Sequence, residues 1–391
     1  MKNLLSNRIQ STPPSFVRSI LKAASDPEII SFAGGLPNPA SFPQADMLAS
    51  MERIVKDHGS KVFQYSITAG LPELRQFVAD RYNRKLGLNL TIDDVLITTG
   101  AQQALDLIGK ALLDDGDGVA IENPTYLAAI QAFCLFQPKF YPVGMTEEGL
   151  DLPQLEAVLR HDVKFMYTIP NFQNPTGITY SARNREQVRE LLRDRNVVLV
   201  EDDPYGELRF EGDFLPYIGM GELPNSILLG TFSKTVAPGM RTGFLICRNP
   251  ELMRALSIAK EASDLHTNIF SQYLIWDYLM HNDYETHIAE IRAMYQAQAQ
   301  AMVDAMDRYF PETVSHTRPE GGMFLWVTLP EGVSAAGLFP KALEKKVAFV
   351  PGDPFYIGAS NVNTMRLNYT NADCETIEEG IRRLGQLLRE C

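Results

Sequence analysis

The sequence predicts an α/β protein with a mostly parallel sheet in a large domain and a smaller α+β domain after it. Between about residues 70 and 250, short apolar runs alternate with helical patterns, as in a parallel sheet with helices on both faces. After that region the pattern changes to long helices, followed by strands that alternate with single helices. A chain of 391 residues suits two domains, or three.

The first region contains short β-rich runs separated by helical patterns. Predicted strands lie at residues 95–98, 119–122, 165–169, 197–201, 227–229 and 243–247. Predicted helices lie at residues 71–86, 101–113, 126–136 and 182–195. Open sheets of this kind bind ligands beyond the carboxyl ends of their strands, so we expect the functional residues in the loops that follow the strands.

The second region is predicted to begin with helical segments at residues 250–279 and 281–309. Strands at 323–329, 347–350 and 364–369 and helices at 335–346 and 374–389 follow. We predict a large domain over residues 46–282 and a small domain over 283–391. Before them we predict an arm at 1–12 and a joining segment at 13–45, with a helix at 15–24 and a Gly- and Pro-rich loop at 31–43.

Composition narrows the class of protein. The net charge of −12 and the pI near 5.1 argue against a phosphate-backbone binder, so we expect no nucleic-acid partner. No apolar stretch reaches the length of a membrane span, and the first residues lack the apolar core of a secretory signal. The four cysteines are scattered without metal-ligand spacing, which favours reduced thiols in a cytoplasmic protein without a metal site.

A lysine follows the predicted strand at 227–229. Thr231 and Ser233 precede Lys234, and Arg241 follows it by seven residues. Two hydroxyls and a guanidinium suit a phosphate dianion. A lone lysine is more often a solvated surface charge. A lysine held beside a bound phosphate, however, suits imine formation with an aldehyde cofactor.

A carboxylate and a phenol follow the predicted strand at 197–201. Asp202 is either a turn or capping residue, or a carboxylate that keeps a cofactor's ring nitrogen protonated. Tyr205, three residues later, is within reach of the ring oxygen in the second interpretation.

Three further strand ends carry weaker patterns. Asn174 opens an Asn-Pro-Thr-Gly sequence that on its own predicts a tight turn. Gly100 joins a strand directly to a helix, which directs backbone N–H groups toward an anion, although many such joints bind nothing. Tyr126 either packs in the core or stacks on a flat cofactor.

Taken together, the five segments resemble fold-type I pyridoxal-5'-phosphate (PLP) enzymes, the class I and II aminotransferases. The subgroup that contains 2-aminoadipate, kynurenine and aromatic aminotransferases is the most similar. The resemblance runs from about Arg8 to the C-terminus, and it implies a large domain with a seven-stranded sheet. It rests on the motifs SFAGGLPNPASFP, QYSITAGLPELR, ITTGAQQALDLIGK, ENPTYLAAIQAF, NFQNPTG, VEDDPYGELRF, GTFSKTVAPGMRTGF, DLHTN, RPEGGMFLWVTLP, VAFVPGDPF and MRLNYT.

The resemblance implies PLP as cofactor and a role for each matching residue. Lys234 binds PLP as a Schiff base and moves the proton, Asp202 pairs with the pyridine nitrogen, and Tyr126 stacks on the ring. Tyr205 and Asn174 contact the ring oxygen. The phosphate is held by Gly100, Ala101, Gln102, Ser233 and Arg241. Ala101 replaces a serine that is frequent in the family, so one hydroxyl contact is missing.

The same resemblance implies the substrate contacts and the assembly. Arg366 holds the substrate α-carboxylate, and Gly35 and Asn174 also bind substrate. Arg18 matches an arginine on a mobile recognition helix that reads a distal carboxylate, although a solvated helix face explains it as well. Tyr65 matches a tyrosine that reaches the neighbouring subunit's phosphate, which implies a homodimer with shared active sites.

Alternatives remain for the reaction and the substrate. The same fold also performs elimination and decarboxylation. A MocR-type regulator needs about 60–70 residues of DNA-binding domain before this fold, and the short N-terminal stretch and acidic charge disfavour it. The expected acceptor is 2-oxoglutarate, and the donor is 2-aminoadipate, kynurenine, an aromatic or a branched-chain amino acid. The roles of Arg8 and His266 stay open, with packing or a surface position as the default.

Overall fold

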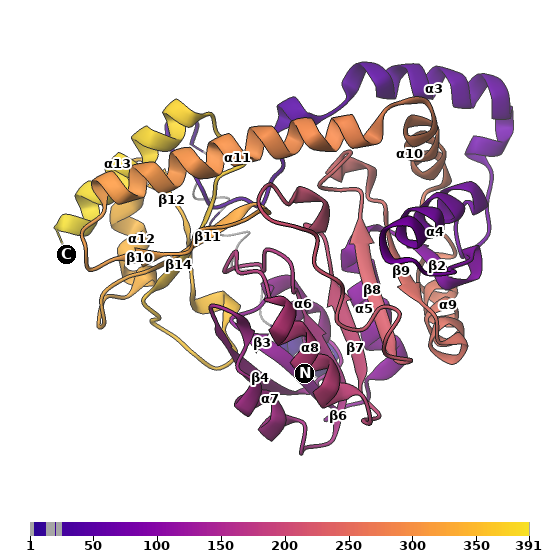
Figure 1. Cartoon of the computed structure of the whole chain (residues 1–391), viewed down its shortest axis with the longest axis horizontal. Helices are drawn as coiled ribbons and strands as arrows, with labels where there is room; N and C mark the ends of the chain where they lie inside the picture. The colour runs from indigo at the N-terminus through magenta and orange to yellow at the C-terminus, as the bar shows by residue number, and fades with distance from the viewer. Residues whose placement is uncertain (1–3, 13–19, 21–25, 391) are drawn as a thin grey trace.

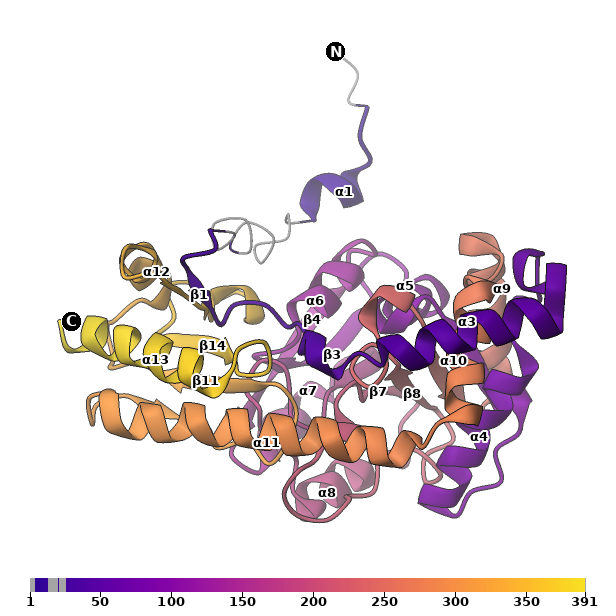
Figure 2. The ribbon, with the colours of Figure 1, turned by 90° about the horizontal axis from the view of Figure 1, so that it is seen from above.

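A computed structural model of the chain describes residues 4–12, 20 and 26–390. The predicted helix at 15–24 lies outside the described residues except for Ile20, and Arg18 is outside them as well. Figures 1 and 2 show a large sheet with helices around it on one side of the molecule and a smaller sheet with the C-terminal helix on the other.

The larger sheet has the order β2-β9-β8-β7-β6-β3-β4-β5. Every neighbouring pair is parallel except the pairs made by β9 and β5, so the mixed, mostly parallel sheet predicted from sequence is confirmed. The strands are β2 (Val95–Thr98), β3 (Gly118–Asn123), β4 (Lys139–Thr146), β5 (Gly149–Leu150), β6 (Val163–Thr168), β7 (Val198–Asp202), β8 (Ser226–Thr231) and β9 (Gly243–Cys247). Seven of these strands have four residues or more, and the two-residue β5 adds an eighth at the edge.

Both faces of this sheet are buried, because successive side chains of its strands enter different cores. In β8, Ile227 and Leu229 pack in one hydrophobic cluster, whereas Leu228 between them packs in another. In β9, Leu245 and Ile246 are divided in the same way. Side chains alternate across a strand, so a run of apolar residues without alternation requires helices on both faces.

The helices around the sheet follow the predicted positions closely, with two additions. They are α3 (Gln44–His58), α4 (Pro72–Leu86), α5 (Gly100–Leu112), α6 (Leu127–Cys134), α7 (Leu152–Val158), α8 (Ala182–Leu192), α9 (Pro250–Asp264) and α10 (Ile269–His281). The sequence interpretation did not include α3 and α7. It also joined α9 and α10 into one helical segment, which was wrong. The chain breaks after Asp264, where Leu265 has a φ of 65° and Asn268 caps α10 by accepting from Ser271 N.

The rest of the chain forms the smaller sheet and its helices. Helix α11 (Tyr284–Tyr309) runs along the molecule and packs against α13 (Cys374–Arg389) (Figure 1). The smaller sheet has the order β10-β11-β14-β13, and β1 pairs with β12. The remaining α-helices and strands of the described residues are α1 (Asn7–Ser11), β1 (Ile30–Ser31), β10 (Ser315–His316), β11 (Phe324–Thr328), α12 (Ala335–Glu344), β12 (Val347–Ala348), β13 (Val350–Pro351) and β14 (Thr364–Asn368). The domain limits stay a prediction.

No helix in the described part of the chain is both long enough and apolar enough to cross a bilayer.

Candidate active site

A cavity of about 400 Å³ lies at the carboxyl ends of the larger sheet's parallel strands. Its walls come from the loops after β3, β6, β7 and β8, and from the first turn of α5. Gly35 from the N-terminal segment and Phe324 and Arg366 from the smaller sheet complete the lining of the cavity. The site is therefore assembled from both sheets and the segment that precedes them.

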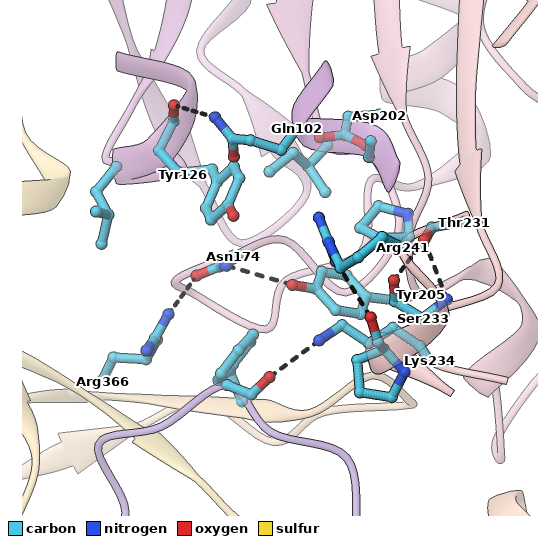
Figure 3. Close-up of a pocket in the computed structure, with 18 residues that line it drawn as sticks. Gln102, Tyr126, Asn174, Asp202, Tyr205, Thr231, Ser233, Lys234, Arg241 and Arg366 are labelled. Atoms are coloured by element: carbon cyan, nitrogen blue, oxygen red, sulfur yellow. Dashed lines mark hydrogen bonds between the residues drawn. The ribbon is translucent and has the colours of Figure 1, made fainter. Parts of the chain in front are cut away.

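Lys234 reaches into this cavity three residues after β8. Its Nζ donates a hydrogen bond to the Gly35 carbonyl oxygen at 2.9 Å, a contact that Figure 3 draws. Burial, together with the positive charges of Arg366 and Arg241, lowers the pKa of Lys234 to about 8. A larger fraction of the amine is therefore neutral near pH 7, as a nucleophile or a base requires.

Asp202, the last residue of β7, presents an incompletely satisfied carboxylate. Its Oδ2 accepts from the Tyr167 hydroxyl at 2.6 Å, whereas its buried Oδ1 has no partner among the described residues. Burial, against the effect of the Tyr167 hydrogen bond and with the charges of Asp203 and Glu122, raises the pKa of Asp202 to about 7. Because a buried acceptor without a donor is costly, Oδ1 points to a ligand that brings a donor, preferably a positively charged one.

Arg366 on β14 is a buried cation with an unused donor. Its Nη1 donates to Asn174 Oδ1 at 2.8 Å and its Nη2 to the Ala33 carbonyl oxygen at 2.9 Å, while the buried Nε has no partner among the described residues. The guanidinium lies 4.2 Å from the ring centroid of Phe324 and 5.1 Å from that of Phe355. Burial lowers the pKa of Arg366 to about 10, so the side chain remains charged at neutral pH. This arrangement favours a carboxylate ligand.

Asn174 connects Arg366 with Tyr205. Its Nδ2 donates to the Tyr205 hydroxyl at 3.3 Å, so one amide side chain orients a cation and a phenol in the same cavity (Figure 3). The turn that carries Asn174 requires glycine at its end. Gly177 has a φ of 72°, and a Cβ there would lie 2.5 Å from the Phe324 carbonyl oxygen.

The far end of the cavity combines a helix N-terminus with hydroxyls and an arginine. Ala101 and Gln102 of the first turn of α5 line it, together with Ser233 and Arg241. The Thr231 hydroxyl donates to Ser233 Oγ at 2.9 Å. A Cβ on Gly100 would lie 2.8 Å from Arg241 Nη2, so this glycine permits the arginine to approach the helix. Backbone N–H groups, the helix dipole and a guanidinium make a strong anion site.

The cavity gathers most of the residues singled out in the sequence: Gly35, Ala101, Gln102, Tyr126, Asn174, Asp202, Tyr205, Ser233, Lys234, Arg241 and Arg366. Gly100 does not line the cavity, but it lies beside Arg241, which does. Tyr65 does not enter it within one chain. Its side chain is 79 % exposed, and its ring makes an edge contact with His266 at 5.9 Å.

Sequence reasoning missed several residues around the cavity. Tyr167, which donates to Asp202, lies inside β6 and has the sequence pattern of an ordinary core residue. Phe324, Leu127 and Ala128 line the cavity from apolar runs that predict only a strand and a helix. Leu127, Ala128 and Phe324 lie within motifs of the family resemblance, but none of these positions carries a chemical signal of its own, because their contribution depends on the tertiary packing.

Residues 38–384 match the sequence model of a protein family whose description is "Aminotransferase class I and II". This chain belongs to the class I and II aminotransferases. A 2-aminoadipate transaminase of Thermus thermophilus is 44 % identical in an alignment of 389 positions that covers 98 % of this chain and 95 % of the relative. The aminotransferase family and the fold-type I resemblance predicted from the sequence are thereby confirmed.

Solved aminotransferase structures share the whole fold. That of Pyrococcus horikoshii kynurenine aminotransferase, in complex with PMP, kynurenine as substrate and its product, has a TM-score of 0.94 and 40 % identity, covering 99 % of this chain and 97 % of that one. That of LysN, an α-aminoadipate aminotransferase from T. thermophilus complexed with N-(5'-phosphopyridoxyl)-L-leucine, has a TM-score of 0.91 and 42 % identity with the same coverage. This chain is accordingly a PLP-dependent aminotransferase that acts on amino acids and 2-oxo acids.

The cavity residues of this aminotransferase fit PLP at three points. The unpartnered Asp202 Oδ1 suits a protonated ring nitrogen, and the Lys234 amine suits an aldehyde. The first turn of α5 with Arg241 suits the phosphate. Tyr126 keeps its proton, because burial raises its pKa to about 12, and it offers a neutral ring to a flat ligand.

Proposed function

We propose that this aminotransferase moves the amino group of 2-aminoadipate, kynurenine, an aromatic or a branched-chain amino acid to 2-oxoglutarate, with Lys234 as the residue that bonds the cofactor. Relatives that are named as 2-aminoadipate, aromatic-amino-acid and kynurenine aminotransferases support the first three of these donors. One observation carries the assignment of the site. A lysine with a lowered pKa, a carboxylate oxygen without a donor and an arginine with an unused N–H line the same 400 Å³ cavity.

In this proposal, different residues of the chain bind different parts of the cofactor. Asp202 would accept from the ring nitrogen, Tyr205 and Asn174 would contact the ring oxygen, and Tyr126 would stack on the ring. Gly100, Ala101, Gln102, Ser233 and Arg241 would hold the phosphate. When bound, PLP supplies an aldehyde for the amino group and a protonated ring that withdraws electrons from the substrate's Cα.

Lys234 and Arg366 act on the substrate. Arg366 would bind the α-carboxylate through its unused Nε–H and the planar guanidinium, which fixes the orientation of the Cα. The Lys234 amine, with its pKa near 8, would take the proton from the substrate's Cα and then donate it to the C4' carbon of the cofactor. Gly35 holds the free amine through its carbonyl oxygen, and we propose that attachment of the cofactor to Lys234 displaces this contact.

We also propose a homodimer with shared active sites. Tyr65 is well exposed in one chain, and it lines a surface hollow together with the exposed Phe63. An exposed patch of this kind favours association. Tyr65 would then reach the phosphate in the partner's cavity. A cytoplasmic location is supported by Cys134, Cys247 and Cys374, which are free thiols.

A donor screen tests the reaction and its substrates. The purified holoenzyme is mixed with 2-oxoglutarate and each candidate donor, and glutamate formation is measured together with the donor's 2-oxo acid. We expect equimolar glutamate and 2-oxo acid with at least one of the four donor types. Release of ammonia or CO2 from the donor without glutamate formation would contradict amino-group transfer and favour another PLP reaction.

A further inference from the structure

A fully buried lysine lies outside the cavity, near the end of α9. The Lys260 side chain has no exposed surface. Its Nζ donates to Asp264 Oδ1 at 2.9 Å and to Gln103 Oε1 and Thr267 Oγ1 at 3.0 Å each. Burying a charged lysine costs folding free energy, whereas a surface ion pair does not carry this cost. A buried lysine with three hydrogen-bond partners therefore suggests a specific role for this side chain.

The partners of Lys260 converge on the residue that precedes α5. Asp264 Oδ2 accepts from Thr99 Oγ1 at 3.1 Å and from Gln103 Nε2 at 2.6 Å. Gln103 Oε1, which also accepts from Lys260, accepts from Thr99 N at 2.8 Å. Both the backbone and the side chain of Thr99 are thus tied to the Lys260–Asp264 pair.

The next residues of this turn are fixed from the opposite side by β9. A Cβ on Gly243 would lie 2.9 Å from the Gly100 carbonyl carbon and 3.0 Å from Ala101 N. Thr98 Oγ1 also donates to the Gly100 carbonyl oxygen at 3.0 Å. The turn at residues 99–102 is therefore clamped between β9 and the end of α9, with its N–H groups at the cavity.

We propose that Lys260 and Asp264 are positioning residues for the phosphate end of the cofactor site, acting through the backbone of residues 99–102. This inference rests on the proposed function, which assigns the phosphate to the first turn of α5. Lys260 also offsets the charge of an acidic group near an anion site. Burial would raise the pKa of Asp264, but hydrogen bonds from Gln103 and Lys260 bring it below its ordinary value, so Asp264 is ionised and needs a cation.

Comparison of PLP with pyridoxal, which lacks the phosphate, tests the proposal. Apoprotein is prepared from the wild type and from Lys260→Met, and the dissociation constant of each ligand is measured by absorbance titration. We expect Lys260→Met to weaken PLP binding about 10-fold or more, because Asp264 and Gln103, which both hold Thr99, lose a charged partner. Pyridoxal binding should change by less than about twofold, because Lys234 and Asp202 are untouched.

Lys110→Met is the matched control. Lys110 also bridges α5 and α9, since its Nζ donates to Asp106 Oδ2 at 2.6 Å and to Ser263 Oγ at 2.9 Å. None of these bonds reaches Thr99 or Gln103. We expect this variant to bind both ligands as the wild type does. A wild type that binds pyridoxal as tightly as PLP would instead contradict the phosphate assignment of the proposed function.

Asp264→Asn provides a second variant, which keeps the shape of a partly exposed side chain and removes its charge. If only charge mattered, removing this acid would tighten PLP binding. Positioning predicts weaker PLP binding, since the amide cannot accept from Thr99 and Gln103 and also pair with Lys260. Unchanged or tighter PLP binding in Asp264→Asn, or an equal loss for PLP and pyridoxal in both variants, would overturn the proposal.

Discussion

At the residue scale, the cavity contains polar groups that the folded chain leaves without partners. Asp202 Oδ1 and Arg366 Nε are both buried, and neither has a hydrogen-bond partner among the described residues. Each such group costs about 1–3 kcal/mol of stability. A cost of this kind is retained where a ligand supplies the missing partner, so the same two atoms that weaken the apoprotein define its site.

The titration of Asp202 makes this cost measurable. Its pKa is about 7 in the folded chain and lies near 3.8 in the absence of burial. The folded chain therefore binds this proton more tightly than the unfolded chain does. Asp202 contributes to the free energy of unfolding below pH 4, and this contribution is lost as the pH rises through 7. We expect the free energy of unfolding of wild-type apoprotein to fall by ~2–4 kcal/mol relative to Asp202→Asn over this range.

Urea unfolding of both apoproteins between pH 4 and pH 8 checks the prediction. Turnover should collapse in the same variant, because the ring nitrogen loses its ionic partner, while part of the PLP binding remains. A stability difference that does not vary with pH, or near-normal half-reaction rates in Asp202→Asn, would contradict the role of this carboxylate.

The role of Arg366 can be tested by replacing its planar guanidinium, which offers paired donors, with the point charge of a lysine. Arg366→Lys keeps the charge but removes the planar pair of donors and the contact with the Phe324 ring. We expect KM to rise roughly 10–100-fold for the amino acid and for the 2-oxo acid, because both carry the α-carboxylate. The absorbance spectrum of the bound cofactor should stay as in the wild type. Steady-state kinetics in which KM is unchanged for both substrates would remove Arg366 from the substrate site.

At the element scale, the loops after the strands position the site, and they depend on buried polar contacts. Glu122 at the end of β3 accepts from Gln173 Nε2 at 2.8 Å, and Gln173 Oε1 accepts from Thr176 N at 2.9 Å. These bonds fix the turn between them, which carries Asn174. The end of β3 therefore holds the turn that follows β6. It can do so because β3 and β6 are neighbours in the sheet.

Gly177 gives a prediction for this turn. Gly177→Ala places a Cβ 2.5 Å from the Phe324 carbonyl oxygen at a φ of 72°, so both the contact and the backbone conformation are strained. Gly87→Ala is a matched control, since Gly87 has a φ of 65° with nothing within 4 Å of the added Cβ.

We expect Gly87→Ala to cost about 1 kcal/mol and Gly177→Ala at least about 2 kcal/mol more, with loss of activity only in the latter. Urea unfolding and steady-state kinetics of the two variants provide the measurement. Equal destabilisation by the two substitutions would show that the contact with Phe324 does not constrain the turn.

Sequence patterns located the buried strands well and the surface elements poorly. Strand β9 was predicted with its observed limits, because five consecutive buried residues leave little room for another interpretation. Strand β4 was not predicted, since Pro142 and Gly144 interrupt its apolar run and only one of its residues is buried. The break between α9 and α10 was missed because Leu265 adopts a positive φ, which its identity does not signal.

At the scale of the whole molecule, the cavity depends on three separate parts of the chain. Gly35, Lys234 and Arg366 meet there although they are about 200 and 130 residues apart in sequence. Local patterns indicated a ligand at the strand ends of the larger sheet, but nothing local linked Arg366 or Gly35 to that edge. Their membership of the site came from the family resemblance, because packing between distant elements has no signal in a single sequence.

The proposed dimer is tested by mixing two variants. Tyr65→Ala removes a side chain that would serve the partner's cavity, and Lys234→Ala removes one that serves its own. Mixed subunits that are refolded together should regain activity, because half of the cavities in a hybrid dimer contain both wild-type residues. Sedimentation of the wild type checks the assembly independently. A fully active monomer, or no recovery in hybrids of proven mixed composition, would contradict shared sites.

Attachment of the cofactor to Lys234 is the central claim, and borohydride reduction tests it most directly. The holoenzyme is reduced and digested, and the modified peptide is identified by mass spectrometry. We predict a single phosphopyridoxyl adduct on Lys234, no adduct at this site in Lys234→Ala, and a loss of turnover of roughly 10²–10⁴-fold or more in that variant. An adduct on another lysine of the wild type, or an active Lys234→Ala variant, would contradict the account.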